Sequence, residues 1–272
     1  MASVGQIIFY SMVTLIVIFS TLIILILAVT FSRSSSQVMS SNTAPVANLS
    51  QDQILSCFLQ TSIGQSGVTQ LSVTWEKRDH GLVYRYSNGA PDLANQIPQF
   101  KGRAELFPQG ITTGNASLLL RNVVRDDEGV YTCSISSSIG GGTLGLSLRT
   151  AAFSEPTFKY ANGTVAAAAS WWFPEPNVTW TDVNDQLLEG ATSVRPEPTG
   201  TFSVDSRLRG ANGSSTYTCR VRNDVVAAVS KVTVTDSGVS GNTYFIFNAA
   251  SSLLPSTFLG LMTSVLSICH IT

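Results

Sequence analysis

The sequence predicts an all-β protein with two β-sandwich domains in tandem and an apolar segment at each end. Charged residues make up 12% of the 272 residues, and Ser, Thr and Gly separate short apolar alternations along most of the chain. This pattern is typical of strands joined by frequent turns. A tyrosine two residues before a cysteine occurs twice, at Tyr131–Cys133 and at Tyr217–Cys219. Because the charged part of the chain is roughly 200 residues long and one sandwich needs about 100, this repeat indicates two domains.

The first domain, residues 33–150, has the cysteine and tryptophan spacing of a variable-type immunoglobulin sandwich. Cys57 ends an alternating apolar stretch, so a strand directs its side chain inward, where Cys133 can meet it from the opposite sheet. We expect a disulfide between these two residues. Trp75 follows Cys57 on the next strand and is expected to pack against the bridge.

The turn before the second cysteine adds three further signature residues. Gly129 provides a tight turn and Tyr131 a tyrosine at the sheet corner, while Arg103 is placed to pair with Asp127. We expect that ion pair to be structural. The glycines at 140–142 indicate the final hairpin. A phosphate-binding loop is the rival interpretation, but it needs a following helix and a Lys-Ser or Lys-Thr pair, and the sequence has neither there.

The second domain, residues 151–236, has the features of a constant-type sandwich. Trp180 follows a proline-rich turn and is expected to be the buried core tryptophan. Tyr217 stands two residues before Cys219, as Tyr131 does before Cys133.

One expected cysteine is missing from this second domain. Ala167 occupies the position on the facing strand that should hold the partner of Cys219. Cys219 is therefore predicted to be an unpaired buried thiol, and the alternative is an intermolecular disulfide. Cys269 is a poor partner because it lies in the apolar C-terminal segment.

All charged side chains lie between Arg33 and Asp236, so both ends of the chain are uncharged. Residues 1–32 include a long apolar run and are predicted to be a signal peptide. An uncleaved signal anchor is the alternative.

At the other end, residues 237–272 are predicted to form a membrane-proximal stalk and a hydrophobic anchor segment. No Lys or Arg follows the apolar tract, which favours a glycolipid-anchor signal over a transmembrane helix. Small residues at Asn248 and Ser240 are the candidate attachment sites, although neither has an ideal spacer.

Five glycosylation sequons lie between the apolar ends and indicate a secretory route to the extracellular face of the plasma membrane. They begin at Asn48, Asn115, Asn162, Asn177 and Asn212.

Composition argues against several other classes of function. The net charge is −1 with no basic block, so we expect no nucleic-acid partner. His80 lies in a polar turn without a recognisable nucleophile motif beside it, which argues against an enzyme and a small-molecule substrate. The cysteines are assigned to sandwich cores, so we expect no metal site and no cofactor.

Short strings suggest a family for the chain. The first seven residues, Ser154-Glu155-Pro156 and Trp172-Phe173-Pro174-Glu175-Pro176 resemble the butyrophilin-like family of T-cell co-signalling ligands. The resemblance extends to about Asp236. Two features depart from the family pattern: the alanine at position 167, and the low similarity after Asp236.

The resemblance implies a plasma-membrane protein whose variable domain is outermost. It also implies binding to a receptor on T cells and negative regulation of T-cell activation, proliferation and cytokine production. A costimulatory ligand and a homophilic adhesion protein are the alternatives. Ligands of this kind use the front sheet of the variable domain, which makes Tyr84, Arg85, Tyr86 and Ile139 the receptor-binding candidates. The alternative for the two tyrosines is ordinary sheet packing.

Overall fold

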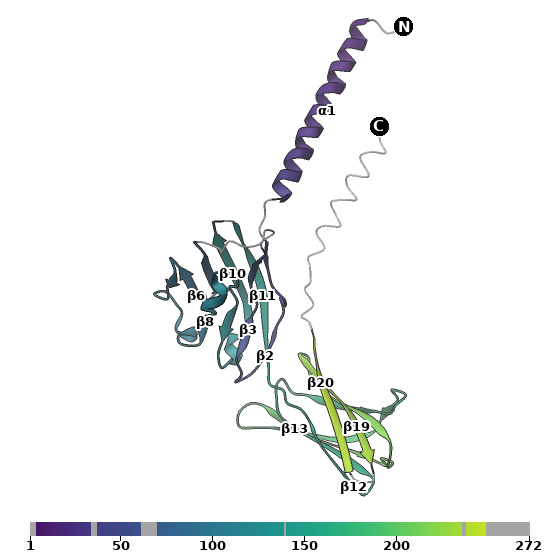
Figure 1. The fold of residues 1–272 in the computed structure, drawn as a ribbon. Coiled ribbons are helices and arrows are strands. Elements are labelled where there is room, and N and C mark those ends of the chain that lie inside the picture. Colours follow the sequence, from purple (N-terminus) through teal and green to yellow (C-terminus); the bar gives the residue numbers. More distant parts are fainter. Residues whose placement is uncertain (1–3, 34–36, 61–69, 139, 236–237, 249–272) are drawn as a thin grey trace. The chain divides into compact units, whose positions relative to one another are not determined.

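The computed structural model describes residues 4–33, 37–60, 70–138, 140–235 and 238–248 (Figure 1). The chain divides into two units, Met1–Leu148 and Arg149–Thr272. Each unit contains a β-sandwich, so the predicted all-β class and the two tandem domains are confirmed.

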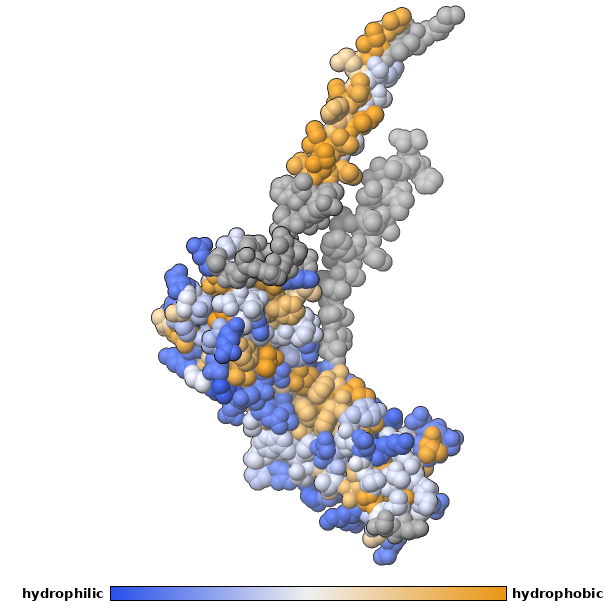
Figure 2. Space-filling model, in the orientation of Figure 1, coloured by the Kyte–Doolittle hydropathy of each residue, from blue (hydrophilic) through white to orange (hydrophobic). Residues whose placement is uncertain are grey.

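A single long helix, α1 (Val4–Arg33), begins the described chain. Its segment Ile8–Leu27 has a mean hydropathy of 2.6 and none of it is buried against the rest of the protein. Figure 2 shows mostly hydrophobic residues along this helix. The length and composition would allow it to cross a membrane, and a signal sequence near the N-terminus has the same properties.

The first sandwich packs a six-stranded sheet against a three-stranded sheet. Three short helical turns and a separate strand pair complete the domain. The six-stranded sheet has the order β2 (Val46–Asn48), β11 (Gly140–Ala151), β10 (Gly129–Ser137), β5 (Ser72–Lys77), β6 (Gly81–Ser87) and β7 (Ala90–Pro91). The other elements are β3 (Gln53–Leu55), β9 (Leu118–Leu120) and β8 (Ala104–Leu106), the pair β1 (Gln37–Met39) and β4 (Phe58–Gln60), and the turns η1 (Pro98–Phe100), α2 (Pro108–Ile111) and η2 (Arg125–Asp127).

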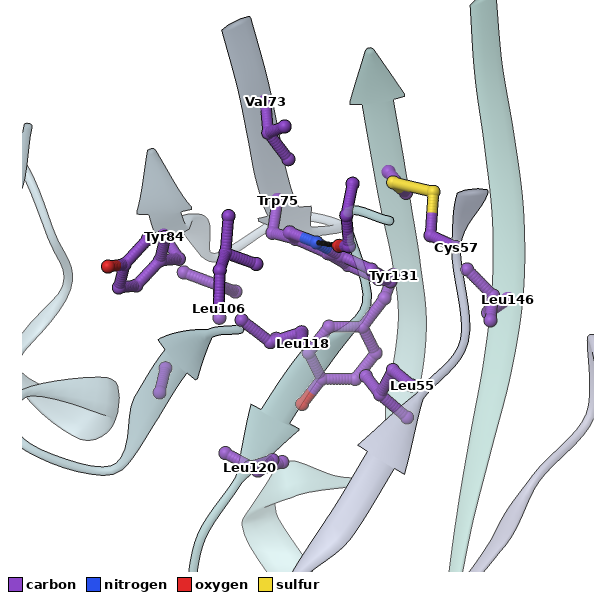
Figure 3. Packing of buried hydrophobic residues seen from close by; sticks show 14 of the residues in the cluster. Leu55, Cys57, Val73, Trp75, Tyr84, Leu106, Leu118, Leu120, Tyr131 and Leu146 are labelled. Carbon is purple, nitrogen blue, oxygen red and sulfur yellow. Dashed lines mark hydrogen bonds between the residues drawn. A yellow bond between two sulfur atoms is a disulfide. The ribbon is translucent and has the colours of Figure 1, made fainter. Parts of the chain in front are cut away.

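The core of the first sandwich is built on the Cys57–Cys133 disulfide, which is confirmed with a Cα–Cα distance of 6.6 Å. Trp75 lies beside the disulfide, fully buried (Figure 3). Its indole Nε1 donates a hydrogen bond to the carbonyl oxygen of Ala116 at 2.8 Å. The polar N–H of this large buried side chain is therefore satisfied, and burial of the ring carries little desolvation cost.

The second sandwich packs a four-stranded sheet against a five-stranded sheet. The first has the order β12 (Thr157–Ala161), β13 (Thr164–Trp172), β17 (Phe202–Arg209) and β16 (Gly190–Pro196). The second has the order β15 (Leu187–Leu188), β14 (Asn177–Thr181), β18 (Thr216–Arg222), β19 (Val226–Thr235) and β20 (Gly238–Phe247).

In the second sandwich Cys219 is a free, fully buried thiol, as predicted. It lies opposite Trp180 in the neighbouring strand β14. Ala167 is also buried and lies opposite Ser206 in β17. The indole Nε1 of Trp180 donates to Oγ of Ser206 at 2.9 Å, so a hydrogen bond between the two sheets stands near the position where a disulfide is usual.

The predicted domain boundary at residue 236 is wrong. Strand β20 pairs with β19 over its whole length, from Thr235–Gly238 to Val226–Phe247, so the predicted stalk is in part a strand of the sandwich. The residue that follows β20, Asn248, lies next to Arg149, the first residue of the second unit. There Nη1 of Arg149 donates to the carbonyl oxygen of Asn248 at 3.3 Å.

Candidate functional site

The outer face of the six-stranded sheet in the first domain, which we call the front face, carries small polar side chains. Its register places Thr74, Ser134 and Thr143 in one row across β5, β10 and β11. The residues that alternate with them along these strands, such as Trp75 and Cys133, point into the core. Across β5, β6, β10 and β11 the front face includes Ser72, Thr74, Glu76, Arg85, Thr132, Ser134, Ser136, Gly141, Thr143 and Gly145.

The front face is shallow and rich in hydroxyl groups. Ser, Thr and Gly side chains project little from the backbone, and Oγ of Ser134 lies 3.1 Å from Oγ1 of Thr143. Arg85 is its long cationic side chain, and its guanidinium lies 3.7 Å from a carboxylate oxygen of Asp92. Both partners remain partly exposed, with side-chain exposures of 35% and 46%. A surface ion pair of this kind is weak, so Arg85 can be redirected toward a binding partner at little cost.

The prediction that Tyr84 is an exposed anchor is wrong. Tyr84 is 7% exposed and belongs to the core cluster, opposite Trp75. Burial raises the pKa of its hydroxyl. Tyr86 shares that inward face, opposite Val73, and packs partly buried against the same core. The two tyrosines therefore lie on one face, as period two predicts, but on the inner one.

Of the remaining predicted contact residues, Arg85 lies on the front face and Ile139 lies outside the described residues. The final hairpin next to it is formed by β10 and β11, as the glycines predict. Gly141 is required there, because a Cβ at that position would lie 2.2 Å from the carbonyl oxygen of Ile135.

A buried ion pair stabilises the turn that precedes Tyr131. Two guanidinium nitrogens of Arg103 lie 2.7 and 2.9 Å from the two carboxylate oxygens of Asp127, which confirms the predicted pair. This bidentate hydrogen bonding raises the pKa of Arg103. The Tyr131 hydroxyl donates to the carbonyl oxygen of Asp127 at 2.6 Å, and burial raises its pKa. Gly129, with φ of +145°, completes the turn.

The second domain also has a tyrosine corner, at Tyr217. Among the described residues of this domain, no ion pair corresponds to Arg103–Asp127. The hydroxyl of Tyr217 accepts a hydrogen bond from the backbone N–H of Asn212 at 2.9 Å. The predicted core roles of Trp180 and Tyr217 are therefore both seen in the structure.

The sequon asparagines differ in accessibility. Asn162, Asn177 and Asn212 of the second domain are exposed, and Asn162 lies in the turn between β12 and β13. Asn48 and Asn115 of the first domain are half-buried. Attachment of a glycan at the three exposed positions requires no rearrangement of the fold.

The described residues contain no group of three or more His, Cys, Asp or Glu side chains that could hold a metal ion. His80 lies in the turn between β5 and β6 and donates its backbone N–H to the carbonyl oxygen of Lys77 at 3.1 Å.

The disulfide, the buried Trp75 and the tyrosine corner together define an immunoglobulin-type protein with a variable-type first domain. Residues 41–149 match the family model of the immunoglobulin V-set domain.

Two named relatives cover almost the whole chain. The human V-set domain-containing T-cell activation inhibitor 1 is 32% identical over 98% of this chain and 97% of its own length. The protein of the same name in Rattus norvegicus is 35% identical over 88% of this chain and 87% of its own length. The solved human B7-H4 IgV-like domain is 34% identical, with a TM-score of 0.37, over 42% of this chain and 96% of that structure. The chain belongs to the family of V-set domain-containing T-cell activation inhibitor 1, whose members are immunoglobulin-type proteins and not enzymes.

Proposed function

We propose that this protein is a cell-surface ligand that binds a receptor on T cells through the front face and inhibits T-cell activation. The observation that carries the proposal is near-full-length similarity to relatives named as T-cell activation inhibitors. The front face supports it, because it presents the half-exposed Arg85, and arginine is enriched at protein–protein interfaces.

The binding surface is tested with two matched substitutions in the first domain. Thr143→Arg places a long charged side chain on the exposed centre of the front face. Ile54→Arg places the same side chain on the outer surface of β3, in the opposite sheet, where Ile54 is 50% exposed. Cells that display the full chain are measured for binding of activated T cells. We expect at least a tenfold loss with Thr143→Arg, about 1.4 kcal/mol or more, and little change with Ile54→Arg. Equal binding by both variants would show that the receptor does not bind at the front face.

The sign of the signal is tested with the same cells in a T-cell proliferation and cytokine assay. Suppression supports an inhibitory ligand, and loss of suppression with Thr143→Arg alone ties it to the front face. Enhanced proliferation would support a costimulatory ligand. Aggregation of the displaying cells without T cells would support homophilic adhesion.

We further propose that the protein is attached to the outer face of the plasma membrane. Support comes from the apolar α1 and from the uncharged C-terminal segment, which lies beyond the described residues. Of the two glycolipid-attachment candidates, Asn248 fits better because it follows the end of β20, whereas Ser240 lies inside that strand and cleavage there would remove most of it. Release of the protein from intact cells by a phospholipase that cuts glycolipid anchors would support a glycolipid anchor, and retention would support a membrane-spanning segment.

A further inference from the structure

Strand β20 forms one edge of the five-stranded sheet in the second domain (Figure 1). One side of its backbone is hydrogen-bonded to β19, and the other side pairs with no described strand. An unpaired edge is a template for another strand, so natural proteins normally keep such edges short or protect them with charges, prolines or bulges.

The other edge strands described next are either short or carry such protection. Strands β2 and β7 of the first domain have three and two residues, and β7 contains Pro91. In the second domain β15 has two residues, β16 carries Arg195 and ends at Pro196, and β12 carries Lys159 and precedes the sequon at Asn162. β20 is ten residues long and has no charge, no proline and no sequon. It is the longest edge strand in the described chain, and it lacks these devices.

The strand is nevertheless firmly attached on its inner side. Oγ1 of Thr243 lies 2.9 Å from Oγ of the buried Ser230. The ring of Phe245 lies 5.1 Å from that of Phe153. Gly241 faces Phe158 of β12, and a Cβ there would lie 2.6 Å from the Phe158 ring. The edge is therefore preformed, and no strand has to fold before a partner can bind.

The outer side of β20 carries two exposed apolar side chains, Tyr244 and Ile246, which are 57% and 47% exposed. Phe247 follows on the inner side, where its ring lies 5.5 Å from that of Phe153, and it is still 48% exposed. Their exposure on an uncharged strand is costly if nothing covers it, because apolar area in water is unfavourable by about 25 cal/mol per Å².

We propose that two copies of the chain pair through β20, edge to edge and antiparallel, about a twofold axis that passes near Asn242. Antiparallel pairing of identical strands is the arrangement that a twofold axis produces. An uncharged edge meets its own copy without like-charge repulsion, and this favours self-pairing over pairing with a charged strand. With the axis at Asn242, Tyr244 of each copy faces Ser240 of the other, and the outer apolar side chains lie beside the neighbouring strand.

The length of the strand fits a stable contact. Pairing of most of its ten residues gives a number of main-chain hydrogen bonds close to the roughly ten of a typical interface. The two five-stranded sheets then form one continuous sheet across the pair, and β20 no longer has a free edge.

The first test uses engineered cysteines in the full chain displayed on cells. A residue on the axis faces its own copy at about 5 Å between Cα atoms, within the range of a disulfide. Asn242→Cys should therefore give a disulfide-linked dimer, twice the mass of the chain, under mild oxidation. Ala191→Cys on the exposed edge strand β16 is the matched control. It should give no disulfide-linked product, and neither should the unmodified chain, so both should run at the mass of one chain under denaturing, non-reducing conditions. Equal cross-linking of both variants, or a product of another mass, would overturn pairing through β20.

The second test breaks and restores the contact without covalent chemistry. Asn242→Lys brings two like charges together at the axis, so co-precipitation of two differently tagged full chains should fall at least tenfold. Co-expression of Asn242→Lys with Asn242→Asp should restore it, because the charges are then opposite. Ala191→Lys should leave association unchanged. Association that persists in Asn242→Lys, or that is not restored by the opposite charge, would contradict the proposal. Neither test depends on T-cell binding, so the proposed receptor function can fail or hold separately.

Discussion

The two domains share a fold but hold their sheets together by different means. In the first, a disulfide links the sheets, and the bidentate Arg103–Asp127 pair stabilises the tyrosine corner. In the second, Cys219 has no partner, and the Trp180–Ser206 hydrogen bond joins the sheets instead. The indole N–H of Trp75 donates to a backbone carbonyl in the first domain, and that of Trp180 donates to a hydroxyl in the second. The comparison shows that the fold requires a packed tryptophan between its sheets but not a covalent bridge.

The largest expected effect comes from removal of the bridge. Cys57→Ala combined with Cys133→Ala should lower the unfolding free energy of the first domain by about 4 kcal/mol, because the bond closes a loop of 76 residues. Pulse proteolysis of the full chain in urea, with cleavage sites assigned by mass spectrometry, measures each domain separately. The second domain should be unaffected, and an equal shift in both domains would show that they unfold as one unit.

The buried ion pair should be next in size. Arg103→Met leaves the fully buried Asp127 carboxylate without its cation and should destabilise the first domain by about 3 kcal/mol. Arg121→Met is the matched control, because its pair with Glu105 at 2.6 Å is exposed to solvent and should contribute little to stability. Similar losses of unfolding free energy in the two variants would mean that the Arg103–Asp127 pair does not stabilise the tyrosine corner more than an exposed ion pair does.

The converse change should make the second domain resemble the first. Ala167→Cys places a thiol at the usual position of the disulfide, in the sheet that faces the one carrying Cys219. The disulfide formed with Cys219 should stabilise the second domain by about 2 kcal/mol. Ala169→Cys, two residues along the same inward face, is the control and should give a free thiol. Thiol counting on the unfolded protein distinguishes the two variants, and an unbridged Ala167→Cys would show that the sheets are too far apart there.

The smallest effect is a dependence of stability on pH in the second domain. Burial raises the pKa of the Cys219 thiol to about 12 in the folded protein, from the 9.0 of an exposed thiol. A raised pKa means that its stabilisation is complete below pH 9 and is lost as the pH rises from 9 toward 12. At pH 10 the loss should be about 1 kcal/mol. Urea unfolding at pH 7 and pH 10 should show this loss in the unmodified chain and not in Cys219→Ala. The same pH response in both proteins would assign it to other groups.

The sequence predicted the elements that depend on spacing along a strand. The spacing of Cys57, Trp75 and Cys133 predicts the disulfide and the tryptophan beside it, and Asp127 to Tyr131 form a local turn. These features need no knowledge of long-range register.

The failures concern features that register decides. Tyr84 and Tyr86 alternate correctly, but only their pairing with Trp75 and Val73 shows that they point inward, and β5 and β6 also have an irregularity between Trp75 and Glu76. Alternation alone cannot choose between two faces. Strand β20 was missed because its uncharged residues resemble a stalk, and only its register with β19 shows that it belongs to the sheet.

The adjacency of Arg149 and Asn248 determines how the second domain responds to mechanical tension. A pulling force applied between these two residues acts at one end of the β19–β20 hairpin, where Val226 faces Phe247. The main-chain hydrogen bonds of β20 are then opened one after another, as in a zipper, instead of being loaded together in shear. The domain should therefore yield first by peeling of β20 at low force, while the sheets around Trp180 stay intact.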